Sequence, residues 1–184
     1  SRRLLTAARE MGFGLKIHAD EIDELGGSLL AGELGAVSAE HLIATGERGM
    51  EALAHGGVTA VLLPCTSLYL NKSFARARDM IARGIPVAVA TDFNPGSCPS
   101  LNIGLCMTMA YLKYRMTSEE ILSAVTINAA CAVNRGGSSG TIEPGKKADM
   151  VIWNAEDMEM LCYRMGSNLA GTVIKNGAIV KNNI

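Results

Sequence analysis

The sequence predicts an α/β protein in which helices cover a parallel sheet and a small β-rich tail follows. Short apolar segments alternate with longer segments of helical periodicity, and most of the apolar segments lack a polar face. Strands that are apolar on both faces are typical of parallel sheets, because helices pack against both sides of such sheets. After residue 135 the pattern changes to a glycine-serine connector and then to strands.

A helix at residues 1–11 is expected first, followed by four strand–helix units. The expected strands lie at residues 13–18, 36–41, 58–64 and 85–91, which are short and rich in apolar residues. The expected helices that follow them lie at residues 24–34, 46–55, 73–83 and 101–114. Glycine is the favoured residue just after a helix, and the first four of these five helices are followed by Gly12, Gly35, Gly56 and Gly84.

One more helix is expected at residues 117–132, before the tail. Its start, Thr117-Ser-Glu-Glu, combines a capping hydroxyl with acids that suit the helix dipole. The tail is expected to hold a strand at residues 148–153 and a hairpin at residues 171–180, turning at Asn176-Gly177, a strong type I′ signal. We therefore divide the chain into a partial barrel unit, residues 1–135, and a linker with a β-rich segment, residues 136–184.

Composition argues against several classes of function. The chain has 184 residues, 48% of them hydrophobic, and a formal net charge of -1, which suits one buried core and gives no field for attracting nucleic acid. No apolar run is long enough to cross a bilayer, and no signal peptide is evident. The five cysteines form no C-x-x-C pair, which favours reduced thiols. We expect a cytoplasmic protein with neither nucleic-acid nor membrane partners.

Polar residues recur where the expected strands end. The first strand ends at His18, the second at His41 and the fourth just before Asp92, while the third leads into Cys65-Thr66-Ser67. Since loops after the carboxyl ends of parallel barrel strands build active sites, this placement favours a shared site. A lone histidine is more often structural, and His55, near a helix end, is interpreted that way. Asp20 and Glu21 could simply solvate a loop.

These residues resemble the pattern of the amidohydrolase superfamily. That superfamily places a His after its fifth barrel strand, a His after the sixth and an Asp after the eighth, the order of His18, His41 and Asp92. The segment from Gly140 to Trp153 resembles the superfamily's return from barrel to β-sandwich. Three further segments are similar to imidazolonepropionases: Lys16-Ile-His-Ala-Asp-Glu21, Glu33-Leu-Gly-Ala-Val-Ser-Ala-Glu-His41 and Ala90-Thr-Asp-Phe-Asn-Pro-Gly-Ser97.

The resemblance implies a fold and an activity. The fold would be the C-terminal half of a (β/α)8 (TIM) metallo-dependent hydrolase barrel, strands five to eight with their helices, plus a tail from the composite β-sandwich domain. The activity would be hydrolysis of the cyclic amide 4-imidazolone-5-propanoate to N-formimidoyl-L-glutamate, in histidine degradation. One divalent metal, zinc or iron, would be the cofactor.

The resemblance also implies residue roles. His18 and Asp92 would bind the metal. Glu21, His41 and Asp92 would be catalytic: His41 would stabilise charge on the carbonyl oxygen, Asp92 would move a proton, and Glu21 could also shuttle one. Glu21 would contact the substrate ring as well. The other end of the substrate would be held by Asn94, Gly96 and Ser97.

The chain departs from the family by lacking the His-x-His that follows the first barrel strand. It is therefore interpreted either as a segment of a longer enzyme or as a half-barrel that pairs with a second copy to protect its sheet edges. In both cases we expect the isolated chain to be inactive and to bind metal weakly. Two other functions remain open: a nucleobase deaminase, which shares the His, His, Asp order, and a non-catalytic half-barrel module.

Overall fold

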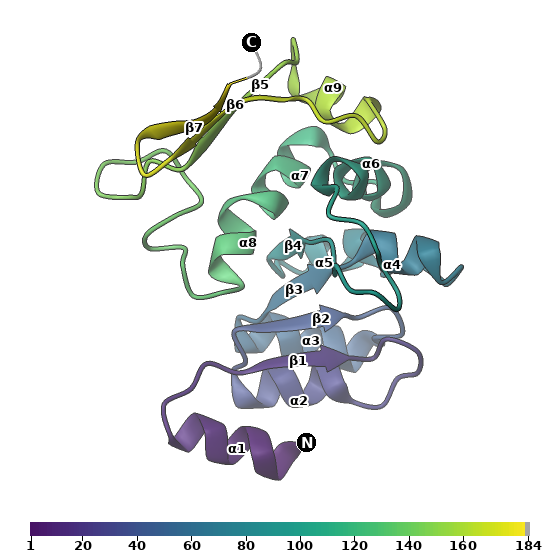
Figure 1. The fold of residues 1–184 in the computed structure, drawn as a ribbon. Helices are drawn as coiled ribbons and strands as arrows, with labels where there is room; N and C mark the ends of the chain where they lie inside the picture. Colours follow the sequence, from purple (N-terminus) through teal and green to yellow (C-terminus); the bar gives the residue numbers. More distant parts are fainter. Residues whose placement is uncertain (183–184) are drawn as a thin grey trace.

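Four parallel strands form the central sheet of the computed structural model, which describes residues 1–182 (Figure 1). The strands neighbour one another in chain order, and each pair is parallel. They are β1 (Lys16–Ala19), β2 (Ser38–His41), β3 (Thr59–Leu62) and β4 (Val87–Val89). The predicted α/β class with a parallel sheet is thus confirmed, whereas the half-barrel and the sandwich origin of the tail stay predictions.

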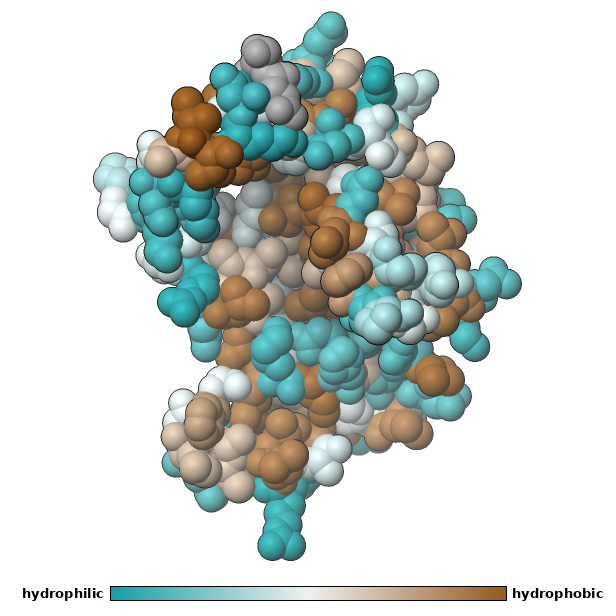
Figure 2. Space-filling view, viewed as in Figure 1, coloured by the Kyte–Doolittle hydropathy of each residue, from teal (hydrophilic) through white to brown (hydrophobic). Residues whose placement is uncertain are grey.

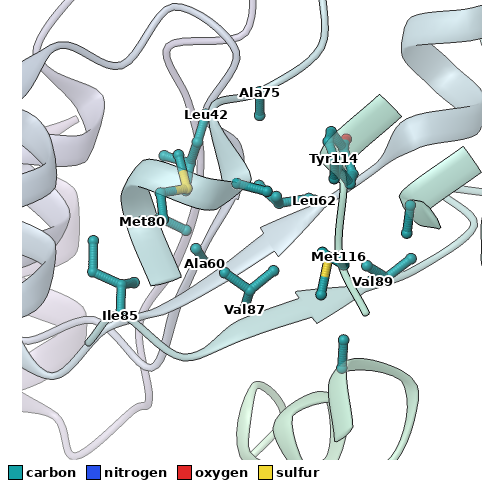
Figure 3. Packing of buried hydrophobic residues seen from close by; sticks show 14 of the residues in the cluster. Leu42, Ala60, Leu62, Ala75, Met80, Ile85, Val87, Val89, Tyr114 and Met116 are labelled. Carbon is teal, nitrogen blue, oxygen red and sulfur yellow. The ribbon is translucent and has the colours of Figure 1, made fainter. Parts of the chain in front are cut away.

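Helices connect consecutive strands, as parallel pairing requires. Helix α1 (Arg2–Glu10) precedes β1, and the connecting helices are α2 (Gly27–Leu34), α3 (Glu47–Gly56), α4 (Pro64–Tyr69) and α5 (Ala77–Ala82). In Figure 1, α2 and α3 lie behind β1 and β2. The main core fills this side of the sheet, where fully buried Leu62 and Ala60 of β3 meet helix residues. Figure 3 shows Met80 of α5 beside Leu42 and Ala60.

Helices α2 and α3 are in backbone contact. A Cβ placed on Gly32 would lie 2.3 Å from the carbonyl oxygen of Ala52, and one on Gly56 would lie 2.6 Å from the carbonyl oxygen of Gly32. Each distance is far below a normal van der Waals contact, so only glycine lets the two helices approach this closely. The closely packed pair lies behind β1 and β2 (Figure 1).

Three helices follow the sheet, where we expected two. They are α6 (Ile103–Tyr114), α7 (Ser118–Val125) and α8 (Ile127–Cys131). We expected one continuous helix at residues 117–132, and this was wrong. Thr126 leaves the helical region (φ -120°, ψ -93°) and separates α7 from α8. The capping box at Thr117 is confirmed. The break turns α8 onto the front face of the sheet, where Ala132 packs with Val61 and Ala88.

The tail is a three-stranded antiparallel sheet in the order β5-β6-β7. Its strands are β5 (Met150–Trp153), β6 (Ala170–Lys175) and β7 (Ala178–Asn182). Positive φ at Asn176 and Gly177 confirms the predicted hairpin turn. Figure 2 shows hydrophobic atoms on the outer surface of the tail, and Ile179 and Val180 of β7 are more than half exposed.

Two short helices were not predicted. Helix α4 begins directly after β3, at Pro64, which we expected to end the strand, and α9 (Met158–Tyr163) lies within the tail. Helix α9 contacts α6, and its buried Leu161 and Cys162 belong to the main core. The division at residue 135 stays a prediction, but the two parts share one core. None of the helices in residues 1–182 combines the length and apolarity that a membrane crossing needs.

Candidate active site

The carboxyl ends of β1 and β2 bring the two predicted site histidines into contact. His18 Nδ1 and His41 Nε2 lie 2.9 Å apart, a hydrogen-bond distance, and their ring centroids are 5.0 Å apart. One nitrogen of this pair must carry a proton and the other accept it, so the imidazoles are coupled. His18 is exposed, whereas His41 is only 4% exposed.

His41 lies in an environment that favours the neutral imidazole. Burial lowers its pKa, while the nearby carboxylates of Glu21 and Asp92 act in the opposite direction. Its buried Nδ1 has no hydrogen-bond partner within residues 1–182, although Glu21 Oε1 is 3.6 Å away. An orphaned buried nitrogen is costly in a folded protein and indicates a ligand or water partner.

Asp92 follows β4 and faces the same cavity as His18. The cavity has a volume of about 820 Å³ and is lined by both residues, by Lys16 and Glu40, and by apolar side chains of β3, β4 and α8. Thr66 Oγ1 donates a hydrogen bond of 2.6 Å to Asp92 Oδ2. The structure therefore places His18, His41 and Asp92 in one neighbourhood, as the sequence indicated.

Two of these residues have unusual backbone conformations. His41 has φ +71° and Asp92 has φ +54°, and both are non-glycine residues in the left-handed region. Such conformations cost roughly 1–3 kcal/mol each and persist where the surrounding structure imposes them. Here the chain turns sharply as it leaves the strand, so the side chain projects at the strand end.

The structure also shows a charged pair that sequence reasoning missed. Lys16 Nζ lies 2.9 Å from Glu40 Oε1 and 2.9 Å from the carbonyl oxygen of Ala132, and it also contacts the Ser38 hydroxyl. Because Lys16 and His18 are two residues apart in β1, they share one face of the sheet. The sequence did hold a signal for Lys16, namely its two-residue separation from His18, but we interpreted this strand as apolar on both faces.

The three residues predicted to hold the far end of the substrate form a closed turn. Asn94 Oδ1 accepts hydrogen bonds from the backbone N–H of Gly96 (2.9 Å) and of Ser97 (2.7 Å), and Asn94 Nδ2 donates to the Asp92 carbonyl (2.7 Å). The turn thus gathers these groups close to Asp92. The N–H groups are already satisfied by Asn94, so a carboxylate would have to displace its amide oxygen.

We considered that Asp20 could be a solvent-exposed loop residue, but its side chain is buried and has a structural role. It is 6% exposed, and its carboxylate accepts hydrogen bonds from backbone N–H groups of Leu25 (3.1 Å), Gly27 (2.9 Å) and Ser28 (3.1 Å). The hydroxyls of Ser28 and Thr45 also donate to it. Burial alone would raise its pKa, yet these bonds outweigh burial and lower the pKa of Asp20.

This environment predicts a stability that depends on acid pH. Because the folded pKa of Asp20 is depressed, its contribution is complete above the unfolded value of about 3.9 and is lost as pH falls through the folded pKa. Denaturant unfolding of the chain should show Asp20→Asn destabilised most near neutral pH, with the difference from wild type shrinking below about pH 4. Equal differences at all pH values would contradict this, and exposed Asp23→Asn is the control.

The donors in this site fit a divalent metal in kind but not in number. Imidazole and carboxylate are ligands that zinc and iron accept, and His18 and Asp92 line one cavity. Across residues 1–182, however, no three His, Cys, Asp or Glu side chains are arranged to hold a metal ion. Catalytic zinc typically has about three protein ligands, so further ligands are needed.

Comparison with known sequences shows the family. The sequence model described as the amidohydrolase family matches residues 2–180. The chain is 53% identical over 178 residues to an imidazolonepropionase of Bacillus cytotoxicus, covering 96% of this chain and 42% of that protein. It is 52% identical over 180 residues to one of Bacillus mycoides, covering 97% and 43%. The chain thus spans less than half the length of these curated relatives.

Solved structures show the same fold at low sequence identity. A zinc-bound adenosine deaminase from Xanthomonas campestris matches with a TM-score of 0.83 and 20% identity, covering 99% of this chain and 48% of that chain. An atrazine chlorohydrolase from Arthrobacter aurescens complexed with zinc matches with a TM-score of 0.82 and 19% identity, covering 100% and 48%. The predicted resemblance to imidazolonepropionases is confirmed, and the chain belongs to the amidohydrolase family.

Proposed function

We propose that this chain carries part of the active site of a hydrolase that opens a cyclic amide ring, 4-imidazolone-5-propanoate, to give N-formimidoyl-L-glutamate in histidine degradation. The observation that carries the proposal is the 53% identity over 178 residues to a relative named imidazolonepropionase. The contact of His18 with His41, beside a cavity that Asp92 also lines, supports it, because hydrolysis of an unreactive amide needs acid, base and electrostatic groups together.

The proposal includes one divalent metal, zinc or iron. His18 and Asp92 would hold it from this chain, and the remaining ligands would come from residues outside this chain. A bound divalent cation supplies Lewis acidity at the carbonyl and lowers the pKa of water to about 7. We therefore expect metal to bind this chain alone weakly, which equilibrium dialysis with Zn²⁺ would measure. Stoichiometric zinc that survives a mild chelator would contradict this expectation.

The chain's own residues would supply the remaining chemistry. Once its Nε2 is released from His18, a neutral His41 would donate its single N–H to the carbonyl oxygen as negative charge develops there, which is worth about 3–4 kcal/mol for one well-placed donor. Asp92 would accept a proton from the attacking water and deliver it to the departing ring nitrogen. Glu21, 3.6 Å from His41, would bind the ring and could relay a proton.

The loop after Asp92 would bind the propionate end of the substrate. Asn94 Oδ1 occupies the position where a substrate carboxylate oxygen would accept hydrogen bonds from Gly96 and Ser97. Binding would therefore exchange one acceptor for another while the donors stay satisfied. A rotated Asn94 would leave its amide free to contact the same carboxylate.

An activity panel tests this function. The complete product of the gene and the 184-residue chain should each be assayed with imidazolone propionate, adenine, guanine and cytosine. We expect turnover of imidazolone propionate by the complete product and none by the chain alone, because the described residues supply too few metal ligands. Preferential deamination of a nucleobase would favour the deaminase alternative, and no hydrolysis at all would favour a non-catalytic module.

A further inference from the structure

We infer that Thr66 is a positioning residue for Asp92, whose hydroxyl fixes one carboxylate oxygen and leaves the other directed to the reacting atoms. This inference rests on the proposed function of Asp92 and adds a residue to the site. Thr66 lies in α4, the helix that begins directly after β3, whereas Asp92 follows β4. The contact therefore joins the ends of two adjacent strands.

The contact itself is short and partly buried. Thr66 Oγ1 donates to Asp92 Oδ2 at 2.6 Å, and Thr66 is only 1% exposed. A hydrogen bond from a hydroxyl to a carboxylate is among the stronger kinds, with typical lengths of roughly 2.5–2.7 Å. In a buried setting such a bond restricts rotation of the carboxylate.

The hydroxyl of Thr66 differs in direction from those of Thr108, inside α6, and Thr126, just past the end of α7. Thr108 Oγ1 donates to the Gly104 carbonyl in its own helix, and Thr126 Oγ1 donates to the Leu122 carbonyl, the usual local pattern. Thr66 instead donates across to Asp92. Thr66 lies in the first turn of α4, where the residue four positions earlier, Leu62, belongs to β3 and its carbonyl accepts the Ala90 N–H, so the hydroxyl reaches the neighbouring strand end instead.

Among residues 1–182, Asp92 is otherwise held through its main chain. Its φ of +54° is strained, and Asn94 Nδ2 donates to its carbonyl oxygen at 2.7 Å. Within residues 1–182, Oδ1 of Asp92 accepts no hydrogen bond, whereas Oδ2 is held by Thr66. Thr66 is thus the side chain that decides which oxygen faces the cavity. Reactions that depend on near-attack geometry lose rate when such a group turns away.

The test uses Thr66→Val and Thr66→Ser in the complete gene product. Valine keeps the shape of threonine and removes the hydroxyl, while serine keeps the hydroxyl. Loss of an outer partner of a metal ligand typically costs about 10–100-fold in activity or metal affinity. We expect Thr66→Val to lower kcat by about that factor with KM little changed and to weaken Co²⁺ binding, followed by visible absorption. Thr66→Ser should restore most of both.

Thr108→Val is the matched control, because it removes a similarly buried hydroxyl that donates to the Gly104 carbonyl within α6. It should leave kcat and Co²⁺ affinity unchanged. If Thr66→Val does not fold, as judged by circular dichroism, Thr66→Ala replaces it. Equal loss in the serine and valine variants would assign Thr66 to packing, and wild-type values in the valine variant would overturn the inference.

Failure of the proposed function has a different signature. If the wild type opens no cyclic amide but still binds Co²⁺, the proposed reaction fails while the affinity comparison continues to test Thr66. A wild type that neither turns over substrate nor binds Co²⁺ would contradict both.

Discussion

Asp92→Asn is expected to lower kcat for ring opening by about 10²–10⁴-fold, the range for removing a general acid–base group. Asparagine has the shape of aspartate and can still accept the Thr66 hydrogen bond, but it cannot take a proton from water. It is also a poor metal ligand compared with a carboxylate. Steady-state kinetics of the complete gene product on imidazolone propionate measures the effect.

Asp79→Asn is the matched control for this prediction. Asp79 lies on α5 in an exposed ion pair with Arg76, and exposed pairs contribute only about 0–1 kcal/mol. Its kinetics should equal those of wild type. An Asp92→Asn enzyme that keeps more than about a tenth of wild-type kcat would remove Asp92 from the chemistry.

Gly32→Ala is expected to destabilise the chain by about 1–3 kcal/mol or more, the usual cost of overpacking. The added methyl would lie 2.3 Å from the backbone oxygen of Ala52, which cannot move without shifting α3. An alanine in a helix is otherwise favourable by about 1 kcal/mol over glycine, so the clash must also offset that gain. Urea unfolding followed by circular dichroism measures the free energy of unfolding.

Gly137→Ala provides the contrast, because a Cβ there meets no atom within 4 Å and its backbone is not left-handed. It should be neutral or slightly stabilising, by up to about 1 kcal/mol. If Gly32→Ala proved as stable as Gly137→Ala, the backbone contact between α2 and α3 would be wrong.

The sequence was sufficient for the parallel sheet and for the contact of His18 with His41. Strands that are apolar on both faces indicate a parallel sheet. The carboxyl ends of parallel strands meet at one edge of the sheet, which brings the residues that follow them together. The position of Asp92 after the fourth apolar strand added it to this neighbourhood, and the resemblance supplied the role proposed for it. The roles of all three residues stay predictions until they are measured.

The features that the sequence did not reveal depend on tertiary contacts. The break at Thr126 carries no glycine or proline, and it separates α7, which contacts α6, from α8, which lies against the sheet. The ion pair of Lys16 could not be predicted because its partner, Glu40, is more than twenty residues away in the chain. Asp20 looked like a loop residue because its hydrogen-bond donors lie at the start of α2. The exact residue at which a helix begins is poorly predicted from sequence.

The positive φ values at His41 and Asp92 have a consequence for engineering. Since the polypeptide bends at the residue itself, the strand end sets the direction in which each side chain leaves the backbone, while Thr66 and Asn94 also hold Asp92. The connecting segment beyond His41 can then be exchanged or lengthened without re-aiming its imidazole, whereas any exchange after Asp92 must keep Asn94. A library of grafted loops behind unaltered strand termini offers a route to hydrolases for other ring systems.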